Sequence, residues 1–166
     1  MRFSVLARPF RASLSILVTV VLAAGLGLIA SGTAQAAPER SAAKIQRALE
    51  VARDQKGDPY VYGADGPNSF DCSGLVQYSY GRAGIGVPRT SGDQARFFNR
   101  RHHKRNIKPG DLMAFYGSGG VYHVGLWTGR WEDGRRLILH ASRSGTPVKV
   151  DRMWTRQWFA ATLRTR

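Results

Sequence analysis

The sequence predicts an α+β domain in which helices come first and pack on an antiparallel sheet. Two segments with helical spacing of apolar residues, 41–56 and 72–84, precede a second half rich in β-forming residues. Helices followed by strands are typical of α+β domains, whereas regular alternation would indicate a parallel sheet. Behind an apolar leader about 130 residues remain, which is the size of one ordinary domain.

The leader has the organisation of a secretory signal peptide. Its first residues are rich in arginine, an uncharged apolar run covers 14–30, and Ala34-Gln35-Ala36 supplies the small-x-small pattern that signal peptidase recognises. The apolar run is nearly long enough to span a membrane, but the small-x-small site at its end favours cleavage over a retained anchor. We expect the mature chain to begin at Ala37, without a stable membrane anchor.

Three helices are expected in the first half of the mature chain. The helical spacing over 41–56 ends at a Gly-Asp-Pro stop. A second helix is expected from Cys72 to Gly84, because Asp71 is a good N-cap residue and the apolar positions fall on one face. A short third helix is expected over 91–98. Cys72 therefore opens a helix.

The second half contains runs of β-branched and aromatic residues separated by turn residues. The predicted strands are 111–116, 121–128, 137–142, 148–153 and 159–163. Residues 129–136 contain Asp133-Gly134 and are expected to form a hairpin loop.

The chain is strongly basic. It has 25 lysines and arginines against 11 carboxylates, a formal charge of +14, and the mature part keeps +11 because the leader contributes three arginines and no acid. Such a charge implies an anionic partner surface, and the secretory leader favours polymers of the cell wall over nucleic acid. The basic cluster at 100–105 is equally consistent with a solvated loop.

Cys72 is the only cysteine of the chain. Because secreted proteins normally pair their cysteines, an unpaired thiol indicates a chemical role, and nucleophilic catalysis is the leading interpretation. A thiol attacks as the thiolate, and a helix N-terminus or a nearby imidazolium lowers its pKa. The expected helix supplies the first of these, and a histidine must supply the second.

Two of the four histidines are candidates for that partner. His102 and His103 lie in the basic cluster, whereas His123 and His140 lie in apolar strands, where a polar side chain needs a partner. Since 123 and 140 sum to an odd number, a bulge-free hairpin with an even loop places both imidazoles on one face, available to Cys72. The alternative is two half-buried histidines satisfied locally. No further ligands stand out, so no metal site is expected.

Six short motifs occur in the order and approximate spacing of a known family. They are Tyr60-Val61-Tyr62-Gly63, Asp71-Cys72-Ser73-Gly74-Leu75-Val76, Pro88-Arg89-Thr90-Ser91, Lys108-Pro109-Gly110-Asp111-Leu112, His123-Val124-Gly125-Leu126 and Leu139-His140-Ala141. Together they resemble the NlpC-type cell-wall peptidases, papain-like cysteine hydrolases of bacterial peptidoglycan, over about residues 57–163.

The resemblance implies a role for each matching residue. Cys72 is expected to be the nucleophile, His123 the general base, and His140 the polar residue that orients the base. Tyr60 is expected to help the backbone N–H of Cys72 stabilise the oxyanion. Ordinary strand packing is the alternative explanation of Tyr60.

Two further residues match substrate-binding positions. Asp71 and Ser73 correspond to positions that in some members contact the free amine of the substrate peptide, although Asp71 is equally explained as the helix N-cap. The resemblance favours cleavage between D-glutamate and the diamino acid of the stem. The high positive charge favours stems that are still attached to the wall.

The sequence departs from the family pattern at several places. Tyr62 and Ala64 stand where tryptophan and glycine are common, Trp127 stands where tyrosine is common, and the hairpin between the histidines is longer than usual. These differences affect the shape of the subsites and remove no catalytic group.

The sequence therefore predicts a secreted, monomeric cysteine endopeptidase of peptidoglycan stem peptides that needs no cofactor and acts outside the cell or at its wall. The expected organisation is a signal peptide over 1–36, an N-terminal helix over 37–56 and an NlpC-type catalytic domain over 57–166. The expected partners are peptidoglycan and anionic wall polymers, and not nucleic acid.

Two alternatives remain open. An N-acetylmuramoyl-L-alanine amidase would use the same three residues, but only an amidase releases the peptide from the muramyl sugar. A non-catalytic, basic envelope-binding protein would have a Cys72 that alkylates no faster than a free thiol.

Overall fold

The computed structural model describes residues 36–98 and 100–164. The expected signal peptide lies outside these residues except for Ala36, which is the first residue of a helix. Within the described part of the chain, no helix combines the length and the apolar character needed to cross a membrane.

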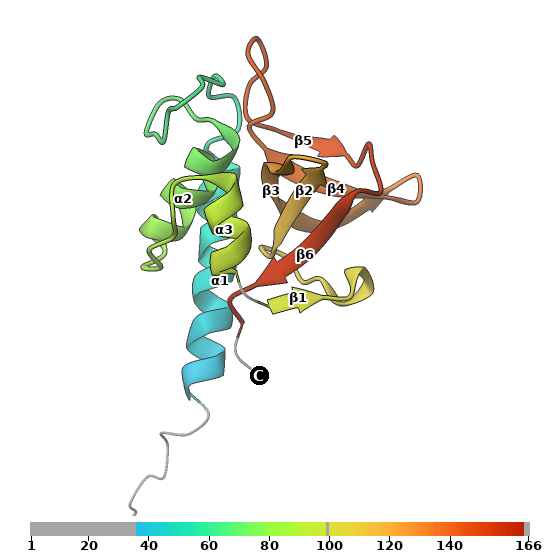
Figure 1. The fold of residues 1–166 in the computed structure, drawn as a ribbon. Coiled ribbons are helices and arrows are strands. Elements are labelled where there is room, and N and C mark those ends of the chain that lie inside the picture. Colours follow the sequence, from blue (N-terminus) through green and yellow to red (C-terminus); the bar gives the residue numbers. More distant parts are fainter. Residues whose placement is uncertain (1–35, 99, 165–166) are drawn as a thin grey trace, which may run out of the picture. The chain divides into compact units, whose positions relative to one another are not determined.

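The described chain begins with three α-helices, in agreement with the sequence (Figure 1). They are α1 (Ala36–Asp54), α2 (Cys72–Arg82) and α3 (Ser91–Phe97). The Asp71 side chain accepts a hydrogen bond from the Gly74 N–H, and the Thr90 side chain accepts one from the Asp93 N–H. Both α2 and α3 therefore start with a side-chain cap, as expected for Asp and Thr at this position.

The strands form one six-stranded sheet with the order β1-β6-β2-β3-β4-β5, in which all neighbours are antiparallel. The strands are β1 (Arg100–His102), β2 (Leu112–Gly117), β3 (Gly120–Glu132), β4 (Arg135–His140), β5 (Lys149–Arg152) and β6 (Trp158–Thr162), and a 3₁₀ turn η1 (Lys104–Asn106) follows β1. The predicted α+β class is confirmed.

The basic cluster differs from the expected loop. Arg100–His102 pairs with Thr162–Ala160 of β6 and forms the edge of the sheet. Charged residues are common on edge strands because they discourage pairing with other chains. The composition of this segment suggests a solvated loop, but its first three residues form a strand.

The hairpin between the two histidines also differs from the expectation. Residues 129–136 are mostly strand, because β3 continues to Glu132 and β4 begins at Arg135. Only Asp133 and Gly134 form the turn, with positive φ angles of 48° and 70°. Positive φ at both central residues is the signature of a type I′ turn, whose twist matches that of the strands. Residues 129–136 are therefore an ordered part of the β3–β4 hairpin, here called the β-arm.

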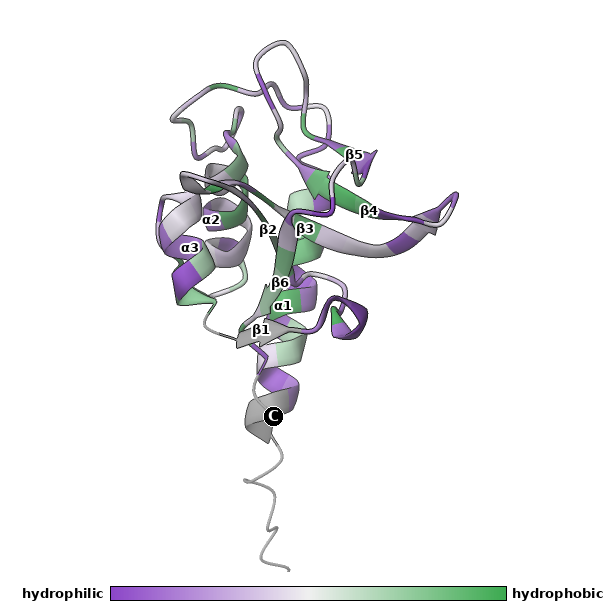
Figure 2. Cartoon of the chain, turned by 45° about the vertical axis from the view of Figure 1, so that its right-hand side comes forward, coloured by the Kyte–Doolittle hydropathy of each residue, from purple (hydrophilic) through white to green (hydrophobic). Residues whose placement is uncertain are grey.

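The two faces of the sheet are buried by different parts of the chain. The helices cover one face, here called the helix face, and the main core lies between them (Figure 1). Its larger members include Ile45, Leu49, Leu75, Tyr80, Leu112, Val124, Leu126 and Leu139. The opposite or outer face carries a second cluster that comprises Ile107, Met113, Phe115, Trp127, Ile138, Met153, Trp158 and Ala160. Figure 2 shows hydrophobic residues in the body of β4 and hydrophilic ones at the β3–β4 tip.

A close backbone contact fixes the start of α2. A Cβ atom on Gly74 would lie 2.1 Å from the Ala64 carbonyl oxygen, and the Asp71 N–H donates to that same oxygen at 2.8 Å. Only glycine allows the preceding loop to approach the helix this closely. The N-terminus of α2, and with it Cys72, is therefore held against the rest of the domain.

Candidate active site

Cys72 lies at the first position of α2 with a partly exposed, unpaired thiol. Burial raises the pKa of Cys72, although the backbone N–H groups of Val124 and Ser73 oppose this effect. The expected lowering by the helix N-terminus is thus outweighed by desolvation. The Val124 contact places the sulfur beside β3, next to His123.

The two candidate histidines lie together. His123 Nε2 and His140 Nδ1 are 2.8 Å apart, and both side chains are almost fully buried. The register Trp127↔Ile138 puts them on the same face of the sheet, as the odd sum predicts. The hairpin is not bulge-free, because the register shifts between Trp127 and Trp131. The shift covers two positions and therefore leaves the faces unchanged.

A carboxylate that the sequence did not single out completes the row. Asp151 Oδ2 lies 3.0 Å from His140 Nε2 and 3.1 Å from Lys149 Nζ. The pairing of His140 with Lys149 across β4 and β5 places all three on one side of the sheet. Hydrogen bonds from His140 and Lys149 lower the pKa of Asp151 in spite of its desolvation. In the sequence, Lys149 and Asp151 are two residues apart and therefore point to the same face of a strand. Only the pairing of β4 with β5 shows that this face meets His140.

The row of hydrogen bonds fixes where the protons lie. An ionised carboxylate only accepts, so His140 must carry its proton on Nε2 to donate to Asp151. The bare Nδ1 of His140 then accepts from His123 Nε2–H. His123 Nδ1 is consequently left with a free lone pair. A lone pair at this atom is what a general base requires.

Both imidazoles are neutral at ordinary pH. Burial, with a smaller contribution from His140, lowers the pKa of His123 to about 3. Burial also lowers the pKa of His140, against the opposing effect of Asp151. Among the described residues Cys72 and His123 share no direct hydrogen bond. Such contacts are often loose without substrate, and the site rests as a neutral thiol beside a neutral base.

Trp154 covers the histidine pair from the outer side. Its ring stacks on Phe115 at 4.5 Å and on His140 at 5.4 Å, and it lies 5.8 Å from the His123 ring. These contacts restrict both imidazoles to one orientation. A base held in one rotamer loses little entropy when it acts.

Two adjoining hollows give access to the site. A cavity of about 530 Å³ is bordered by Tyr60, Tyr62, Cys72, Arg89 and Tyr122, with smaller contributions from Gly63, Asp71, Ser73, Thr90, Ser91 and Val121. A smaller hollow of about 170 Å³ is lined by Tyr122, His123, Ser142 and Trp154. Tyr122 borders both, so together they form a cleft with the thiol on one side and the base on the other.

Tyr60 lies in the larger cavity. Burial raises its pKa, and the nearby Asp71 carboxylate raises it further. The hydroxyl therefore keeps its proton and can donate a hydrogen bond. Tyr60 and Cys72 border the same cavity, and the role of Tyr60 at the oxyanion stays a prediction.

Asp71 is engaged by the protein itself. Its carboxylate accepts from Arg89 through Nη1 at 2.9 Å and Nη2 at 2.6 Å, and from the N–H groups of Gly74 and Gly63 at 2.7 and 3.0 Å. Ser73 Oγ donates to it at 3.2 Å. Burial alone would raise the pKa of Asp71, but Arg89 and the N–H groups hold it below its usual value. The N-cap interpretation is confirmed, and contact of Asp71 or Ser73 with a substrate amine stays a prediction.

The departures from the family pattern fall in different places. Tyr62 is 87% exposed and borders the larger cavity, so it helps to shape a subsite. Trp127 belongs to the cluster on the outer face and borders neither hollow of the cleft. Among residues 36–98 and 100–164, no group of three or more His, Cys, Asp or Glu side chains is placed to hold a metal ion.

A cysteine at a helix N-terminus, set against a strand that carries one of two coupled imidazoles, is the arrangement found in papain-like domains. A family model described as the NlpC/P60 family matches residues 57–166. The chain belongs to the NlpC/P60 family, and the resemblance seen in the sequence is confirmed.

The relatives include a probable endopeptidase and a peptidoglycan hydrolase. A probable endopeptidase of Corynebacterium glutamicum is 39% identical over 121 residues, which cover 73% of this chain and 53% of that protein. The chain thus spans about half the length of this relative. The solved structure of the peptidoglycan hydrolase RipB of Mycobacterium tuberculosis is 30% identical, with a TM-score of 0.62 over 77% of this chain and 68% of that one.

One structural neighbour is not an enzyme. RipD of M. tuberculosis is described as a non-catalytic NlpC/p60 domain protein adapted to peptidoglycan binding. It is 26% identical, with a TM-score of 0.58, over 72% of this chain and 97% of that chain. The family therefore includes both hydrolases and binding proteins.

Proposed function

We propose that this chain is a thiol peptidase that hydrolyses peptide bonds in the stem peptides of peptidoglycan. The observation that carries the proposal is the hydrogen-bonded series His123–His140–Asp151. It begins on β3, the strand whose Val124 backbone contacts the Cys72 thiol. A non-catalytic domain has no need for a buried pair of imidazoles whose tautomers are fixed by a carboxylate. The family membership supplies the substrate class.

The reaction follows from the proton positions. As Cys72 Sγ attacks the amide carbonyl, its proton passes to the free Nδ1 of His123, and the carbonyl oxygen becomes an oxyanion. The Cys72 backbone N–H and the Tyr60 hydroxyl are the donors for that oxyanion. His123 then returns the proton to the leaving amine, and the C–N bond breaks to give a thioester. Water, deprotonated by His123, attacks the thioester and restores the thiol.

Asp151 acts through the histidines as a positioning residue. When His123 takes a proton, positive charge develops on its ring, and this charge is stabilised along the hydrogen bonds to His140 and Asp151. The carboxylate also keeps both tautomers in the productive form. In the serine-hydrolase triad a single carboxylate has this role, and here His140 relays it.

We propose that the enzyme cleaves between D-glutamate and the diamino acid of stems that are still attached to the wall. A free-amine subsite at Asp71 would need a carboxylate lacking a cation, but Arg89 already provides one through two hydrogen bonds. An added ammonium would have to compete with an ion pair that is largely shielded from water. The sequence-predicted leader supports secretion to the cell wall, where the enzyme acts as a monomer.

The test is digestion of defined peptidoglycan fragments, followed by mass spectrometry of the products. The native chain should release fragments cut within the stem, and Cys72→Ala should lose at least about 10³-fold in rate with an unchanged melting temperature. Turnover by Cys72→Ala would refute the thiol mechanism. Release of intact stems from the muramyl sugar would show the amidase instead.

Turnover is also the measurement that separates the enzyme from a binding protein. Because burial raises the pKa of Cys72, slow alkylation of the substrate-free thiol is expected for both. A binding protein would retain fragments without cutting them. A thioester trapped on Cys72 by a slow substrate would establish catalysis directly.

A further inference from the structure

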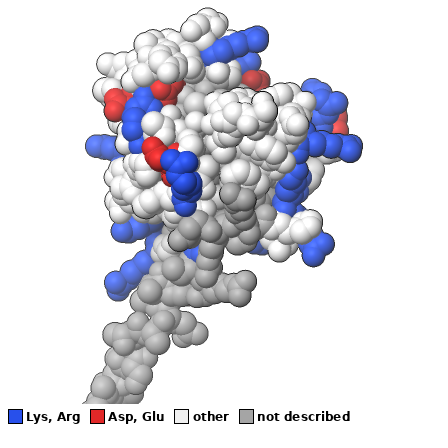
Figure 3. All heavy atoms as spheres, in the orientation of Figure 1, with Lys and Arg blue, Asp and Glu red and all other residues white. Residues whose placement is uncertain are grey.

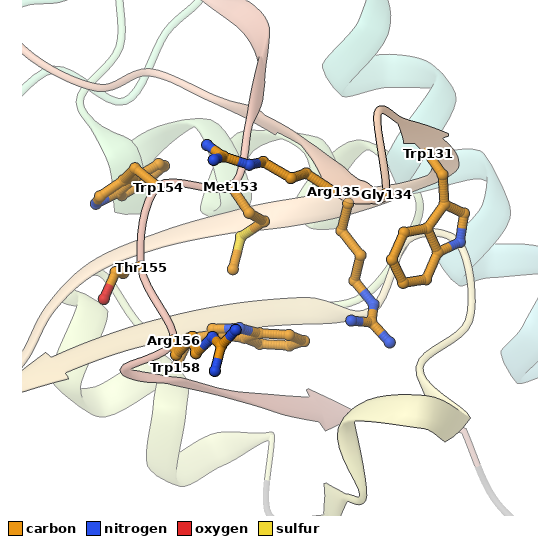
Figure 4. A pocket seen from close by; sticks show the side chains of 9 residues that line it. Trp131, Gly134, Arg135, Met153, Trp154, Thr155, Arg156 and Trp158 are labelled. Carbon is orange, nitrogen blue, oxygen red and sulfur yellow. The ribbon is translucent and has the colours of Figure 1, made fainter.

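The outer face of the sheet has a pocket of its own, beside the β3–β4 arm. Its volume is about 580 Å³, within the range of ligand-binding pockets. It lies between the arm and the connection from β5 to β6 (Figure 4). In that view Trp131 lies at one end, Trp154 at the other, and Arg156 and Trp158 along one side. We call it the cationic pocket.

Its lining contains arginine and no carboxylate. Arg135, Arg136 and Arg156 border it, together with three tryptophans. The acids nearest in sequence are held elsewhere, because Glu132 and Asp133 both pair with Arg152, at 2.7 and 2.8 Å. In the described chain no ion pair engages Arg135 or Arg156. Figure 3 shows lysine and arginine side chains gathered along the edge where Figure 1 places β4 and the hairpin.

Arg136 is held in place before any ligand arrives. Its guanidinium lies 4.3 Å from the Trp131 ring and 5.4 Å from the Trp158 ring, and Nη2 donates to the Lys104 carbonyl at 2.9 Å. Its Nε is buried and has no acceptor among the described residues. A buried donor of a charged group is costly to leave unpaired. Such a donor points to an acceptor that the protein alone does not supply.

We propose that the cationic pocket binds an anionic strand of the cell wall, with the phosphate or carboxylate groups held by Arg135, Arg136 and Arg156. Guanidinium groups pair with both kinds of anion through two parallel hydrogen bonds. Trp131 remains 53% exposed and offers a flat surface for the sugar or polyol between the charges. The cell-wall origin of the strand rests on the proposed function.

The position of the pocket gives this binding a purpose. Trp154 borders the cationic pocket, and it also lines the hollow at His123 and stacks on His140. A wall strand in the pocket therefore lies next to the cleft, on the side away from the helices. The β-arm that builds it is the segment that we expect from the sequence to be longer than the family pattern.

The experiment is titration of the native chain, followed by tryptophan fluorescence, with three probes at equal ionic strength. The probes are a synthetic glycerol phosphate hexamer, a galacturonic acid hexamer and a six-nucleotide oligothymidylate. Arg135→Gln/Arg156→Gln should weaken binding of the preferred wall-like probe by at least about tenfold, since two charge-assisted contacts are lost. The hexamer that binds more tightly identifies the anion as phosphate or carboxylate.

A charge-matched control separates the pocket from the overall charge. Lys56→Gln/Arg82→Gln removes two exposed cations, one in the turn after α1 and one at the end of α2, neither of which borders the cationic pocket. It should change binding less than about twofold, because such charges act only through the screened field. Equal losses in both double variants, an unaffected Arg135→Gln/Arg156→Gln protein, or tighter binding of the oligothymidylate would each overturn the proposal.

Hydrolysis of a soluble stem peptide is measured in the same proteins. Arg135→Gln/Arg156→Gln should keep the native rate, because the pocket does not touch the cleft cavity beside Cys72. If no protein cuts the peptide, the proposed function fails, while the titrations still decide whether the pocket binds the anionic probes.

Discussion

The cleft at Cys72 and the cationic pocket differ in how their charges are balanced. In the cleft, Asp71 is paired with Arg89, and the imidazoles end on Asp151. In the pocket, arginines surround a hollow without a carboxylate. A site whose polar groups are already satisfied is ready to act on a neutral amide, whereas a site with unpaired cations is ready to receive an anion. In the proposed functions, chemistry and attachment therefore use two adjoining sites that differ in charge and share Trp154.

The largest effect should come from removing the general base of the cleft. His123→Ala removes the proton acceptor and should lower kcat by at least about 10³-fold, whereas His140→Gln keeps an acceptor for His123 Nε2–H and should retain part of the activity. Rates on a soluble stem peptide are the measurement. An active His123→Ala beside an inactive His140→Gln would reverse the two roles.

A smaller loss of activity is expected when Asp151, which ends the hydrogen-bonded series His123–His140–Asp151, is replaced. Asp151→Ala should reduce kcat by about 10- to 100-fold with KM unchanged, because the tautomer and orientation of the histidines are no longer fixed. Asp151→Glu should recover part of this loss. A rise in KM alone, or no rescue by glutamate, would show that Asp151 has only a structural role.

The pH dependence should reflect the buried base. Because burial lowers the pKa of His123 to about 3, its neutral form persists as the pH falls. The acid limb of kcat/KM should therefore lie below the ordinary histidine range near pH 6.5. A limb at or above that value would show that the pKa of the essential base is not lowered, in contradiction to the burial of His123.

The Asp71–Arg89 pair should stabilise the fold in a pH-dependent way. Arg89→Gln should lower the free energy of unfolding at pH 7 by about 1–3 kcal/mol, because it leaves a buried carboxylate without its cation. The folded pKa of Asp71 is lowered, so the contribution is present above about pH 4 and is lost as the pH falls through the folded pKa. The difference between variant and native protein should shrink on acidification.

An exposed ion pair provides the matched control for Arg89. Arg96 pairs with Asp93 on the surface of α3, and exposed pairs contribute little. Arg96→Gln should leave chemical denaturation almost unchanged at both pH values. Equal losses for the two variants would show that the Asp71–Arg89 pair is not special.

The smallest effect is expected from salt, which should slow reactions that depend on the cationic pocket and spare those that depend on the cleft alone. Raising salt from about 0.05 to 0.5 M should slow the digestion of isolated walls, because attraction between the cationic pocket and the polymer is screened, and leave soluble-peptide hydrolysis nearly unchanged. An equal salt response of both substrates would place the electrostatic step in the cleft.

The sequence predicts the two sites unequally. Cys72, His123 and His140 follow from local patterns, because an N-cap and strand parity determine which way these side chains point. Asp151 is missed since its contact depends on the pairing of β4 with β5, and the turn between these strands does not reveal their register. Arg89 appears in a motif, but only the fold shows that its partner is Asp71.

The cationic pocket could not be found from the sequence for a related reason. Its arginines come from the β-arm and from the connection before β6, and residues 129–136 gave only the pattern of a loop. The distinction between free and engaged arginines also depends on Arg152, whose pairing with Glu132 and Asp133 joins two strands. The amino-acid composition gives the number of cationic residues, but it does not show which of them are paired with a carboxylate.

The two-residue turn at Asp133 and Gly134 has a consequence for how such proteins can change over generations. Insertions that lengthen both strands of the arm equally move the tip outward and leave His123 and His140 in register. A single inserted residue would instead turn one imidazole to the wrong face unless a bulge absorbed it. Under the proposed functions, the length of the arm could therefore change the wall preference, while the base of the hairpin keeps the catalytic register.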